Sequence, residues 1–416
     1  MALEYGLIGE TLGHSFSPQI HAKLGGYAYD LHPLPPEALD DFMRRRPFRG
    51  INVTIPYKKA VIPYCSQLTP AAQAIGSVNT IVRLADGTLR GDNTDLYGLM
   101  SLARRAGVSM EGKKVVILGT GGTSLTAQAA ARQLGARQIV VVSRRGPETY
   151  EGLAGRHADA QVLINTTPVG MYPKGGPMAA DPRLFPRLEG ALDVIYNPLR
   201  TAFVQAARSM GIPAAGGLFM LVAQAKAAAE QFLGRPLDDG SIQAIHRDLA
   251  GQLQNIVLVG MPGSGKSSVG ALLAQRMGRP FLDLDNLVEQ QAGMAIPQIF
   301  TQQGEEAFRR LEAQAMAQAG ARTGCVIATG GGTVLRPENR QAMAQNGFVV
   351  WLQRDLSLLP TEGRPLSAGG PEALEALLRQ RSPLYRAASH YAICNSGPLQ
   401  QTAELIMEAF YEAAGH

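Results

Sequence analysis

Short runs of branched apolar residues alternate with longer amphipathic stretches along the whole chain. The pattern is clear where an apolar run at 113–119 leads into an alanine-rich helical stretch at 123–136 and then into a second apolar run at 138–142. Strands that alternate with helices of this length are typical of α/β folds with mainly parallel sheets. At 78–93 two strand-like runs follow each other directly, and Asp86-Gly87 between them predicts a hairpin turn.

The alternating pattern starts afresh near residue 254. An amphipathic helix is predicted over 241–253, and the strand IVLVG and a glycine-rich loop follow without a Gly/Ser spacer. A strand, a loop of this kind and a helix are how a nucleotide-binding domain begins. We therefore expect a separate domain at 254–416 after a two-lobed first part, in which one lobe spans 1–98 and is completed by 213–252 and the other spans 99–212.

Composition excludes several classes of protein. Apolar residues make up 45% of the 416 residues and charged residues 18%, which excludes a highly charged disordered chain. Cys65, Cys325 and Cys394 form no C-x-x-C pair, which argues against a zinc site or a disulfide framework. The net charge of +5 comes without a basic stripe interleaved with aromatic residues, so we expect no nucleic-acid partner. With no leader pattern and no apolar run of roughly 18 residues, we expect a cytoplasmic protein without a membrane partner.

The loop that opens the last domain carries the most specific motif. Residues 260–267 fit G-x-x-x-x-G-K-[ST], with a strand before them and a helical pattern after them. In such a loop backbone N–H groups hold phosphate oxygens, Lys266 reaches the β- and γ-phosphates, and the Ser267 hydroxyl binds Mg²⁺. Lys266 is the only lysine after residue 254, in a stretch that otherwise uses arginine. The predicted ATP-binding residues are Gly263, Ser264, Gly265, Lys266, Ser267 and Ser268.

Further motifs follow this loop in order. Asp283 and Asp285 alternate at the end of a predicted strand, where one suits Mg²⁺ and the other a substrate hydroxyl. Three glycines at 330–332 end another strand with bare backbone, against which a ring-shaped substrate can lie. Charged candidates follow at Arg309, Glu312, Arg364 and Arg381.

With these motifs in this order, residues 255–416 resemble the shikimate kinases, small P-loop enzymes that phosphorylate the 3-hydroxyl of shikimate. The resemblance implies that Asp285 accepts the hydroxyl proton, that Ser267, Asp283 and also Glu312 organise Mg²⁺, and that Arg364 covers the phosphates from a lid. That lid is short here, and a second arginine usual in it is not evident. The implied shikimate-binding residues are Asp285, Arg309, Gly330, Gly331, Gly332 and Arg381, with the two arginines on the carboxylate.

In the first part, polar residues recur where predicted strands end. Ser15 and Ser17 follow the first strand and can bind a carboxylate, although Ser17-Pro18 also fits an N-cap and first turn of a helix. Lys58 and Asp95 can form an acid–base pair, against the alternative of a solvated surface lysine beside Lys59. The other polar candidates at strand ends are Asn52, Thr54 and Asn79.

A glycine-rich turn at 119–124 lies between a predicted strand and a predicted helix. It resembles the dinucleotide fingerprint, although Ser124 stands where a third Gly or Ala is usual. An NAD site needs an acidic residue about 20 positions on, and this chain has Ser143-Arg144-Arg145 after the next strand instead. Arginine can pair with the 2′-phosphate of NADP, so NADP(H) is favoured over NAD(H).

Together with NTTPVGM at 165–171, DVIYNP at 193–198 and GGLFMLVAQ at 216–224, these motifs make residues 1–252 resemble the shikimate dehydrogenases. The resemblance implies Lys58 and Asp95 as the catalytic pair. It implies that 3-dehydroshikimate or shikimate is held by Ser15, Ser17, Thr54, Asn79, Asp95 and Gln224. The implied NADP(H) contacts are Gly119, Gly121, Gly122, Ser143, Arg144, Met171, Gly217 and Met220.

The chain is thus predicted to be a bifunctional enzyme of aromatic amino acid biosynthesis, monomeric or homodimeric. An α/β substrate lobe and a Rossmann lobe would reduce 3-dehydroshikimate with NADPH. A P-loop domain, with a parallel sheet flanked by helices, would phosphorylate shikimate with ATP and Mg²⁺. Two alternatives remain open from the sequence: a quinate/shikimate dehydrogenase with a weakened kinase, and a sensor that kept both pockets but lost the chemistry.

Overall fold

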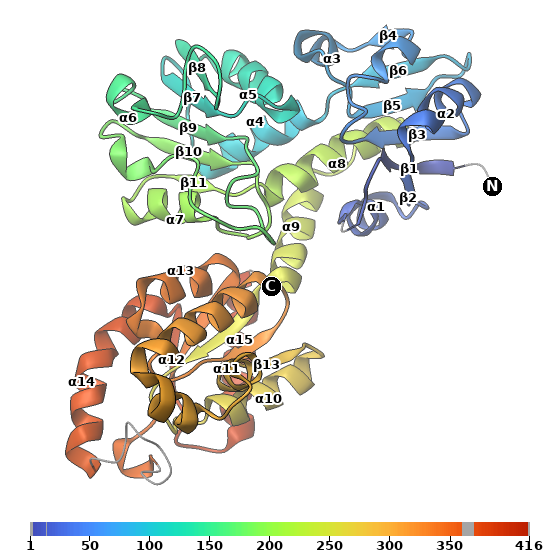
Figure 1. Ribbon diagram of the computed structural model, residues 1–416. Coiled ribbons are helices and arrows are strands. Elements are labelled where there is room, and N and C mark those ends of the chain that lie inside the picture. The colour runs from blue at the N-terminus through green and yellow to red at the C-terminus, as the bar shows by residue number, and fades with distance from the viewer. Residues whose placement is uncertain (1–2, 14, 360–369, 415–416) are drawn as a thin grey trace. The chain divides into compact units, whose positions relative to one another are not determined.

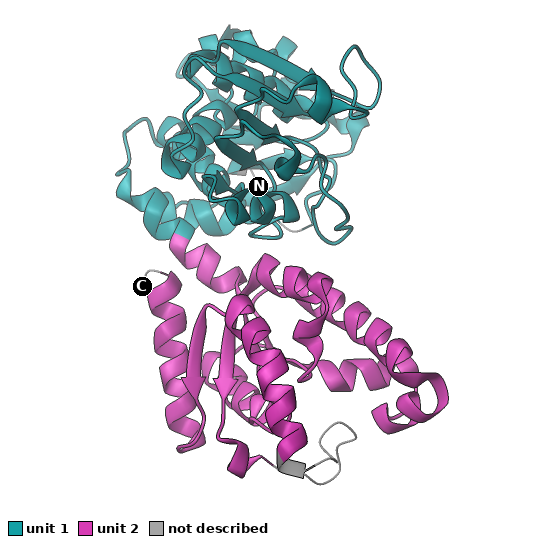
Figure 2. Cartoon of the chain, turned by 90° about the vertical axis from the view of Figure 1, so that its left-hand side faces the viewer, with its two compact units in different colours: residues 1–246 teal, residues 247–416 magenta. Residues whose placement is uncertain are grey.

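In the computed structural model the chain forms two compact units, residues 1–246 and 247–416 (Figure 2). The structure describes residues 3–13, 15–359 and 370–414. The division lies inside α9 (Gly240–Leu253), the amphipathic helix that the sequence predicts there. Among the described residues no helix is both long and apolar enough to cross a membrane.

The first lobe of unit 1 is a mixed six-stranded sheet with the order β2-β1-β3-β5-β6-β4. Its strands β1, β2 and β3 are parallel, whereas β5 runs antiparallel to β3 and β6, which confirms the predicted hairpin. The strands are β1 (Leu3–Gly9), β2 (Asp30–Pro33), β3 (Phe48–Val53), β4 (Gln67–Leu68), β5 (Thr80–Arg83) and β6 (Leu89–Asp92). The helices are α1 (Ser17–Gly25), α2 (Leu39–Arg45) and α3 (Pro70–Ile75).

The second lobe of unit 1 is a parallel five-stranded sheet with the order β11-β10-β9-β7-β8. Its strand β7, helix α5 and strand β8 form the predicted βαβ unit, and α5 begins directly at the glycine-rich turn. The strands are β7 (Lys114–Leu118), β8 (Gln138–Val142), β9 (Val162–Asn165), β10 (Gly190–Asp193) and β11 (Ala214–Ala215). The helices are α4 (Asp95–Ala106), α5 (Gly122–Gln133), α6 (Leu153–Arg156) and α7 (Ala202–Ser209).

Helix α8 (Leu218–Leu233) joins the two lobes of unit 1 (Figure 1). It packs against α4 on one side and against α1, β3 and β5 of the first lobe on the other. The approach to α4 is so close that a Cβ atom on Gly98 would lie 2.7 Å from the carbonyl oxygen of Met220. Only glycine fits there, and the two helices therefore form a tightly packed connection between the lobes.

Unit 2 is built on a parallel five-stranded sheet with the order β13-β14-β12-β15-β16. Trp351, the only tryptophan of the chain, lies on β15 and packs near Tyr385, with ring centroids 5.8 Å apart. The strands are β12 (Asn255–Val259), β13 (Phe281–Asp283), β14 (Val326–Ala328), β15 (Gly347–Gln353) and β16 (Tyr391–Cys394). The helices are α10 (Lys266–Met277), α11 (Leu284–Ala292), α12 (Ile296–Ala321), α13 (Pro337–Asn346), α14 (Gly370–Ala388) and α15 (Leu399–Ala414).

Two histidines, the buried His21 and the half-buried His246, make the stability of unit 1 dependent on pH. His21 stacks on Tyr29, and burial lowers its pKa to about 3; burial likewise lowers the pKa of His246 to about 4. Both pKa values lie below the roughly 6.5 of an unfolded chain, so the unfolded state binds more protons as the pH falls. Asp193 acts oppositely, because burial raises its pKa to about 6 and its contribution to stability decreases as the pH rises from about 4 to 6.

We expect the two histidines to dominate, so that unit 1 loses stability as the pH falls from about 6.5 to 5. Each histidine contributes up to about 1.4 kcal/mol per pH unit in this window. Urea unfolding of the full chain at several pH values, followed by circular dichroism, measures the effect. The variant His21→Gln should show a visibly smaller pH dependence, and an unchanged one would contradict the assignment.

Candidate functional sites

Polar residues of the first lobe gather at one edge of its sheet. The carboxyl ends of β1, β3 and β6 meet there, because Ile8 pairs with Val53. Strand β5 starts at the same edge, since it is antiparallel and Thr80 lies opposite both Asn52 and Asp92. The predicted residues that follow these strand ends or precede the start of β5 are Ser15, Ser17, Thr54, Lys58, Asn79 and Asp95.

Lys58 and Asp95 form an ion pair at this edge. The Lys58 Nζ atom lies 2.6 Å from Asp95 Oδ2, and the two side chains are 23% and 14% exposed. The backbone at Lys58 is held in place because the Lys58 carbonyl accepts a hydrogen bond from the Val78 amide at 2.8 Å. The alternative of a solvated surface lysine therefore does not hold for Lys58, whereas it does hold for the exposed Lys59.

A buried hydrogen-bond network fixes the position of Asp95. The Asn79 side chain accepts from the Thr94 amide at 2.8 Å and donates to Thr94 Oγ1 at 3.1 Å, directly before Asp95. Asn52 in turn accepts from the Tyr29 hydroxyl at 2.7 Å and donates to Thr80 Oγ1 at 3.0 Å. Both ends of the Asn79 amide are thus engaged in holding the start of α4.

The serine loop differs from the prediction at its helix start. Helix α1 begins at Ser17, and the N-cap is Phe16, which has no side-chain acceptor. The predicted N-cap role of Ser17 is therefore wrong; instead Ser15 Oγ accepts from the Ser17 amide at 3.2 Å. The Phe16 ring meets Tyr196 of the second lobe edge-on at 5.9 Å. Gln224 lies on α8 and donates to the Leu221 carbonyl at 2.8 Å, and among the described residues it forms no hydrogen bond with Lys58 or Asp95.

The glycine-rich turn leaves the start of α5 bare. Gly121 is the N-cap and Gly122 the first helical residue, and a Cβ atom on either would meet nothing within 4 Å. Beyond β8, Ser143 Oγ donates to the Arg145 carbonyl at 2.6 Å. Arg144 and Arg145 are exposed and form no ion pair with any residue that the structure describes. A helix N-terminus beside two uncommitted guanidinium groups suits a nucleotide with an additional phosphate.

The other predicted cofactor residues differ from one another in packing and in exposure. Gly119 packs against Thr166, and Gly217 caps α8 so tightly that a Cβ atom there would lie 2.1 Å from the Val194 carbonyl oxygen. Met171 is exposed on a loop after β9, whereas Met220 is buried against α4. Met220 therefore belongs to the packed interior of the unit, whereas the side chain of Met171 is open to solvent.

In unit 2 a pocket of about 800 Å³ gathers most of the predicted kinase residues. Ser264 and Asp283 do not line it: Ser264 is completely buried, and Asp283 lies behind Ser267. Arg364 lies outside the described residues. The predicted residues that line the pocket are Gly263, Gly265, Lys266, Ser267, Ser268, Asp285, Arg309, Glu312, Gly330, Gly331, Gly332 and Arg381.

The P-loop is folded for a nucleotide and a hard cation. Lys266 Nζ donates to the carbonyls of Gly260 at 3.0 Å and Met261 at 2.9 Å. Ser267 Oγ donates to Asp283 Oδ2 at 2.6 Å, so a hydroxyl and a carboxylate oxygen lie together beside the loop. The described residues contain no group of three or more His, Cys, Asp or Glu that could hold a metal. Two oxygen ligands fit Mg²⁺, which binds few protein groups and completes its shell with water and phosphate.

Asp285 does not lie on the strand as predicted. Strand β13 ends at Asp283, whose Oδ1 accepts from the Asp285 amide at 3.0 Å and so caps α11. Asp285 is therefore in the first turn of a helix, from which it lines the pocket. The two carboxylates take separate positions, one beside Ser267 and the other on the pocket wall.

The two arginines expected on a carboxylate differ in their surroundings. Arg309 donates to Glu312 at 2.9 Å and to Glu305 at 3.1 Å, and Glu312 also accepts from Thr333 at 2.7 Å. Each oxygen of Glu312 thus accepts one hydrogen bond, and the carboxylate holds Arg309 in place at the pocket. Arg381 is 3% exposed, and its Nε and Nη1 atoms are buried without a partner. A buried guanidinium with unused donors at a pocket wall is satisfied by an anionic ligand group.

Arg354 was missed from the sequence. It follows β15, lines the pocket and directs Nη1 at the Gly263 carbonyl, 3.5 Å away. Its Nε atom is buried without a partner. The only sequence signal was its place directly after an apolar strand, since no motif contains it.

Comparison with known proteins agrees with this geometry in both units. A family model for the substrate binding domain of shikimate dehydrogenase matches residues 7–81, and a shikimate kinase model matches residues 262–411. A Clostridium perfringens shikimate dehydrogenase (NADP(+)) is 35% identical over 266 residues, which are 59% of this chain and 97% of that protein. A Symbiobacterium thermophilum shikimate kinase is 48% identical over 169 residues, 38% of this chain and 97% of that protein.

A solved structure resembles the first part. The crystal structure of a chorismate mutase/shikimate 5-dehydrogenase fusion protein from Clostridium acetobutylicum matches with a TM-score of 0.56 and 33% identity. The match covers 60% of this chain and 97% of that one. The α/β fold predicted for this part is therefore confirmed.

Proposed function

Since the chain belongs to the shikimate dehydrogenase family in its first part and to the shikimate kinase family in its second, we propose that it catalyses two consecutive reactions. It reduces 3-dehydroshikimate to shikimate with NADPH and then phosphorylates shikimate with ATP. The observation that carries the proposal is that one chain keeps both charged centres, the Lys58–Asp95 pair and the P-loop pocket around Lys266. A sensor without chemistry has no need of either, and the two curated relatives described above are a shikimate dehydrogenase and a shikimate kinase.

For the reduction, NADPH supplies the hydride when it is bound to the second lobe. The Lys58 ammonium group donates the proton to the carbonyl oxygen as it becomes an alkoxide, and Asp95 holds Lys58 in place and shares the proton. Arg144 pairs with the 2′-phosphate of the cofactor. The substrate is oriented by hydrogen bonds from Ser15, Ser17, Thr54, Asn79 and Gln224.

For the phosphorylation, ATP and Mg²⁺ supply the phosphoryl group and its charge neutralisation. Lys266 exchanges its two loop carbonyls for phosphate oxygens, and Asp285 accepts the proton of the attacking hydroxyl. Ser267 and Asp283 supply the protein oxygens for the cation. Arg381, together with Arg309, pairs with the substrate carboxylate, against the bare backbone of Gly330, Gly331 and Gly332.

A coupled assay of the purified chain tests the proposal. With 3-dehydroshikimate and NADPH we expect shikimate, and with ATP and Mg²⁺ added we expect a singly phosphorylated product by mass spectrometry. Quinate and NADH serve as parallel arms and should react far more slowly. A preparation that consumes neither NADPH nor ATP with these substrates would show that the proposal is wrong.

Arg354 is expected to stabilise the transferred phosphoryl group, in the place of the lid arginine that the sequence lacks. The variant Arg354→Gln should lower kcat/KM for ATP by about 10- to 100-fold, the effect of one charge-assisted hydrogen bond, and leave the reduction unchanged. The exposed Arg379, changed to Gln in parallel, is the control. Equal kinetics for Arg354→Gln and Arg379→Gln would contradict a role of Arg354 in phosphoryl transfer.

We further propose that the enzyme works in the cytoplasm as a monomer or homodimer, without nucleic-acid or membrane partners. Both reactions use small polar metabolites and cofactors, which agrees with that location. Size-exclusion chromatography with light scattering measures the oligomeric state.

A further inference from the structure

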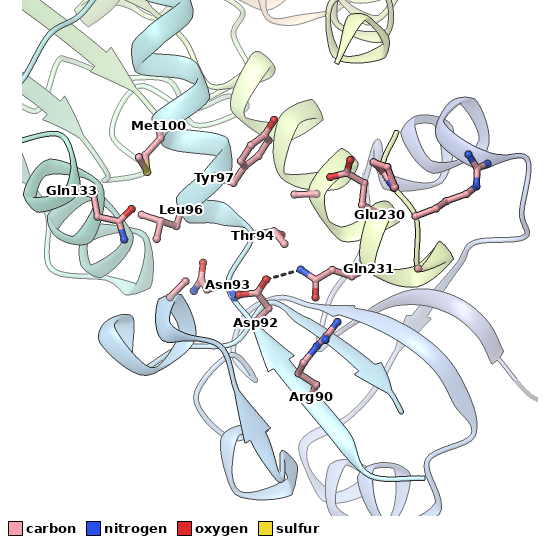
Figure 3. Close-up of a pocket in the computed structure, with 15 residues that line it drawn as sticks. Arg90, Asp92, Asn93, Thr94, Leu96, Tyr97, Met100, Gln133, Glu230 and Gln231 are labelled. Atoms are coloured by element: carbon pink, nitrogen blue, oxygen red, sulfur yellow. Dashed lines mark hydrogen bonds between the residues drawn. The ribbon is translucent and has the colours of Figure 1, made fainter. Parts of the chain in front are cut away.

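A second pocket of about 760 Å³ lies between the two lobes of unit 1 (Figure 3). Strand β6 and the loop after it form one wall, α4 and the end of α5 another, and α8 the third. None of the residues proposed above to hold substrate or NADPH lines it. It is therefore a separate cavity, with no part in the reduction as described.

Four charged side chains line the pocket: Glu230 pairs with Lys226, whereas Arg90, Asp92 and the exposed Arg235 form no ion pair with residues that the structure describes. Arg90 and Asp92 lie two residues apart on β6, so their side chains leave the same face of the strand. Arg90 forms no hydrogen bond or ion pair with any residue that the structure describes, and its Nε atom is buried without a partner. Asp92 accepts hydrogen bonds from Thr69, from the Asn93 amide and from Gln231, but within the described ranges it forms no ion pair.

Two amide oxygens in the same pocket lack donors. Gln231 donates from Nε2 to Asp92 at 2.5 Å, and its Oε1 is buried without a partner. Asn93 is 2% exposed and donates to the Ser77 carbonyl at 2.9 Å, while its Oδ1 also lacks a partner. Figure 3 shows Arg90 extending from β6 toward Gln231, with Asp92 between Gln231 and the Asn93 side chain.

This set of unused groups indicates a ligand. Buried polar atoms without partners are rare in folded proteins, and here three of them line one cavity. The terminal torsion of an amide is soft, so a donor in the pocket can draw the Asn93 and Gln231 oxygens toward it. A ligand that fits must offer an anionic acceptor to Arg90 and a cationic donor to Asp92 and the two amides.

We propose that this pocket binds a free α-amino acid with an apolar side chain. Its carboxylate pairs with Arg90, and its ammonium group donates to Asp92 and to the two amide oxygens. Its side chain lies against Leu96, Tyr97 and Met100 of α4, which provide the apolar part of the lining. A plain anion would leave Asp92 without a cation, and a plain amine would leave Arg90 without an anion.

The position of the pocket links its occupancy to the reduction. Asn93 and Thr94 lead directly into Asp95, and Gln231 lies two turns after Gln224 on α8. A ligand that contacts the Asn93 loop and α8 therefore changes the placement of Asp95. We expect occupancy to alter kcat/KM of the reduction and to leave the phosphorylation unchanged.

Calorimetric titration of the full chain with leucine, methionine, phenylalanine, tyrosine and tryptophan tests the site. We expect saturable binding of at least one of them, one molecule per chain, in the presence of saturating shikimate and NADP⁺. The matching amine without a carboxylate and the matching acid without an ammonium group should bind at least tenfold more weakly. Absence of binding by all five, or equal binding of either analogue, would overturn the proposal.

Two variants with the same substitution locate the site. Arg90→Met should weaken binding by about 10- to 100-fold, the factor of one lost charge-assisted hydrogen bond. Arg104→Met, an exposed arginine at the end of α4 outside the pocket, should bind as the parent does. The reduction rate without amino acid reports that both variants are folded. Unchanged binding by Arg90→Met, or binding that leaves the reduction rate unaltered, would contradict the assignment.

Discussion

Lys58→Ala should lower the rate of 3-dehydroshikimate reduction by about 10²- to 10⁴-fold, the range for loss of a positioned proton donor. The Lys58 Nζ atom lies 2.6 Å from Asp95, so the substitution removes both the donor and the partner that orients Asp95. The loss should appear mainly in kcat, because the substrate hydroxyl and carboxylate contacts remain. Oxidation of NADPH measures it directly.

The neighbouring lysine provides a matched control. Lys59 is exposed, and Lys59→Ala should reduce substrate at the parental rate. Phosphorylation of shikimate by Lys58→Ala should also be unchanged, since unit 2 has its own sheet and its own core. Loss of both activities in a folded Lys58→Ala chain would contradict the model of two independent centres.

Lys266→Ala should have the opposite effect, with phosphorylation reduced by about 10²- to 10³-fold and reduction intact. This lysine is the P-loop cation for the β- and γ-phosphates, and a preorganised charge at a transferred phosphoryl group is worth roughly 3–4 kcal/mol. Lys266→Arg should not restore the rate, because a planar guanidinium group is too broad for a site held by the carbonyls of Gly260 and Met261. Release of ADP measures the effect.

A surface position on the same helix serves as the control for Lys266. Arg276 lies in the last turn of α10 and pairs with Glu404, away from the pocket, so Arg276→Ala should phosphorylate shikimate normally. A Lys266→Ala chain that retains most of its kinase activity would show that the P-loop does not carry the reaction.

The parts of the fold that the sequence predicted are those determined by neighbouring residues. The P-loop, the βαβ unit around the turn at 119–124 and the hairpin of β5 and β6 each depend on glycines and apolar runs within about 30 residues. The motif order also brought the residues of the kinase pocket together correctly, although they come from five separate segments. Parallel strands explain why the P-loop and the three glycines meet, since the carboxyl ends of β12 and β14 lie at one edge, whereas Asp285, Arg309 and Arg381 reach the pocket from helices.

The details that failed depend on contacts between distant residues or on competition at an element end. Ser17 was predicted as an N-cap because Ser-Pro is a common helix start, yet the N-cap is Phe16 and Ser17 is already the first residue of α1. Asp285 was placed on a strand, but Asp283 caps the next helix and draws it into α11. The commitment of Glu312 to Arg309 and Thr333, and the presence of Arg354 beside the P-loop, become visible only in three dimensions.

Trp351 is an intrinsic fluorophore that lies in unit 2 alone. It is the single indole, and it lies next to Tyr385, whose hydroxyl donates to the Gly331 carbonyl at the wall of the kinase pocket. Tryptophan fluorescence, excited selectively, therefore reports on the phosphorylating unit 2, because unit 1 contains no tryptophan. Occupancy and unfolding of one half can be followed in the intact chain without dyes, tags or dissection.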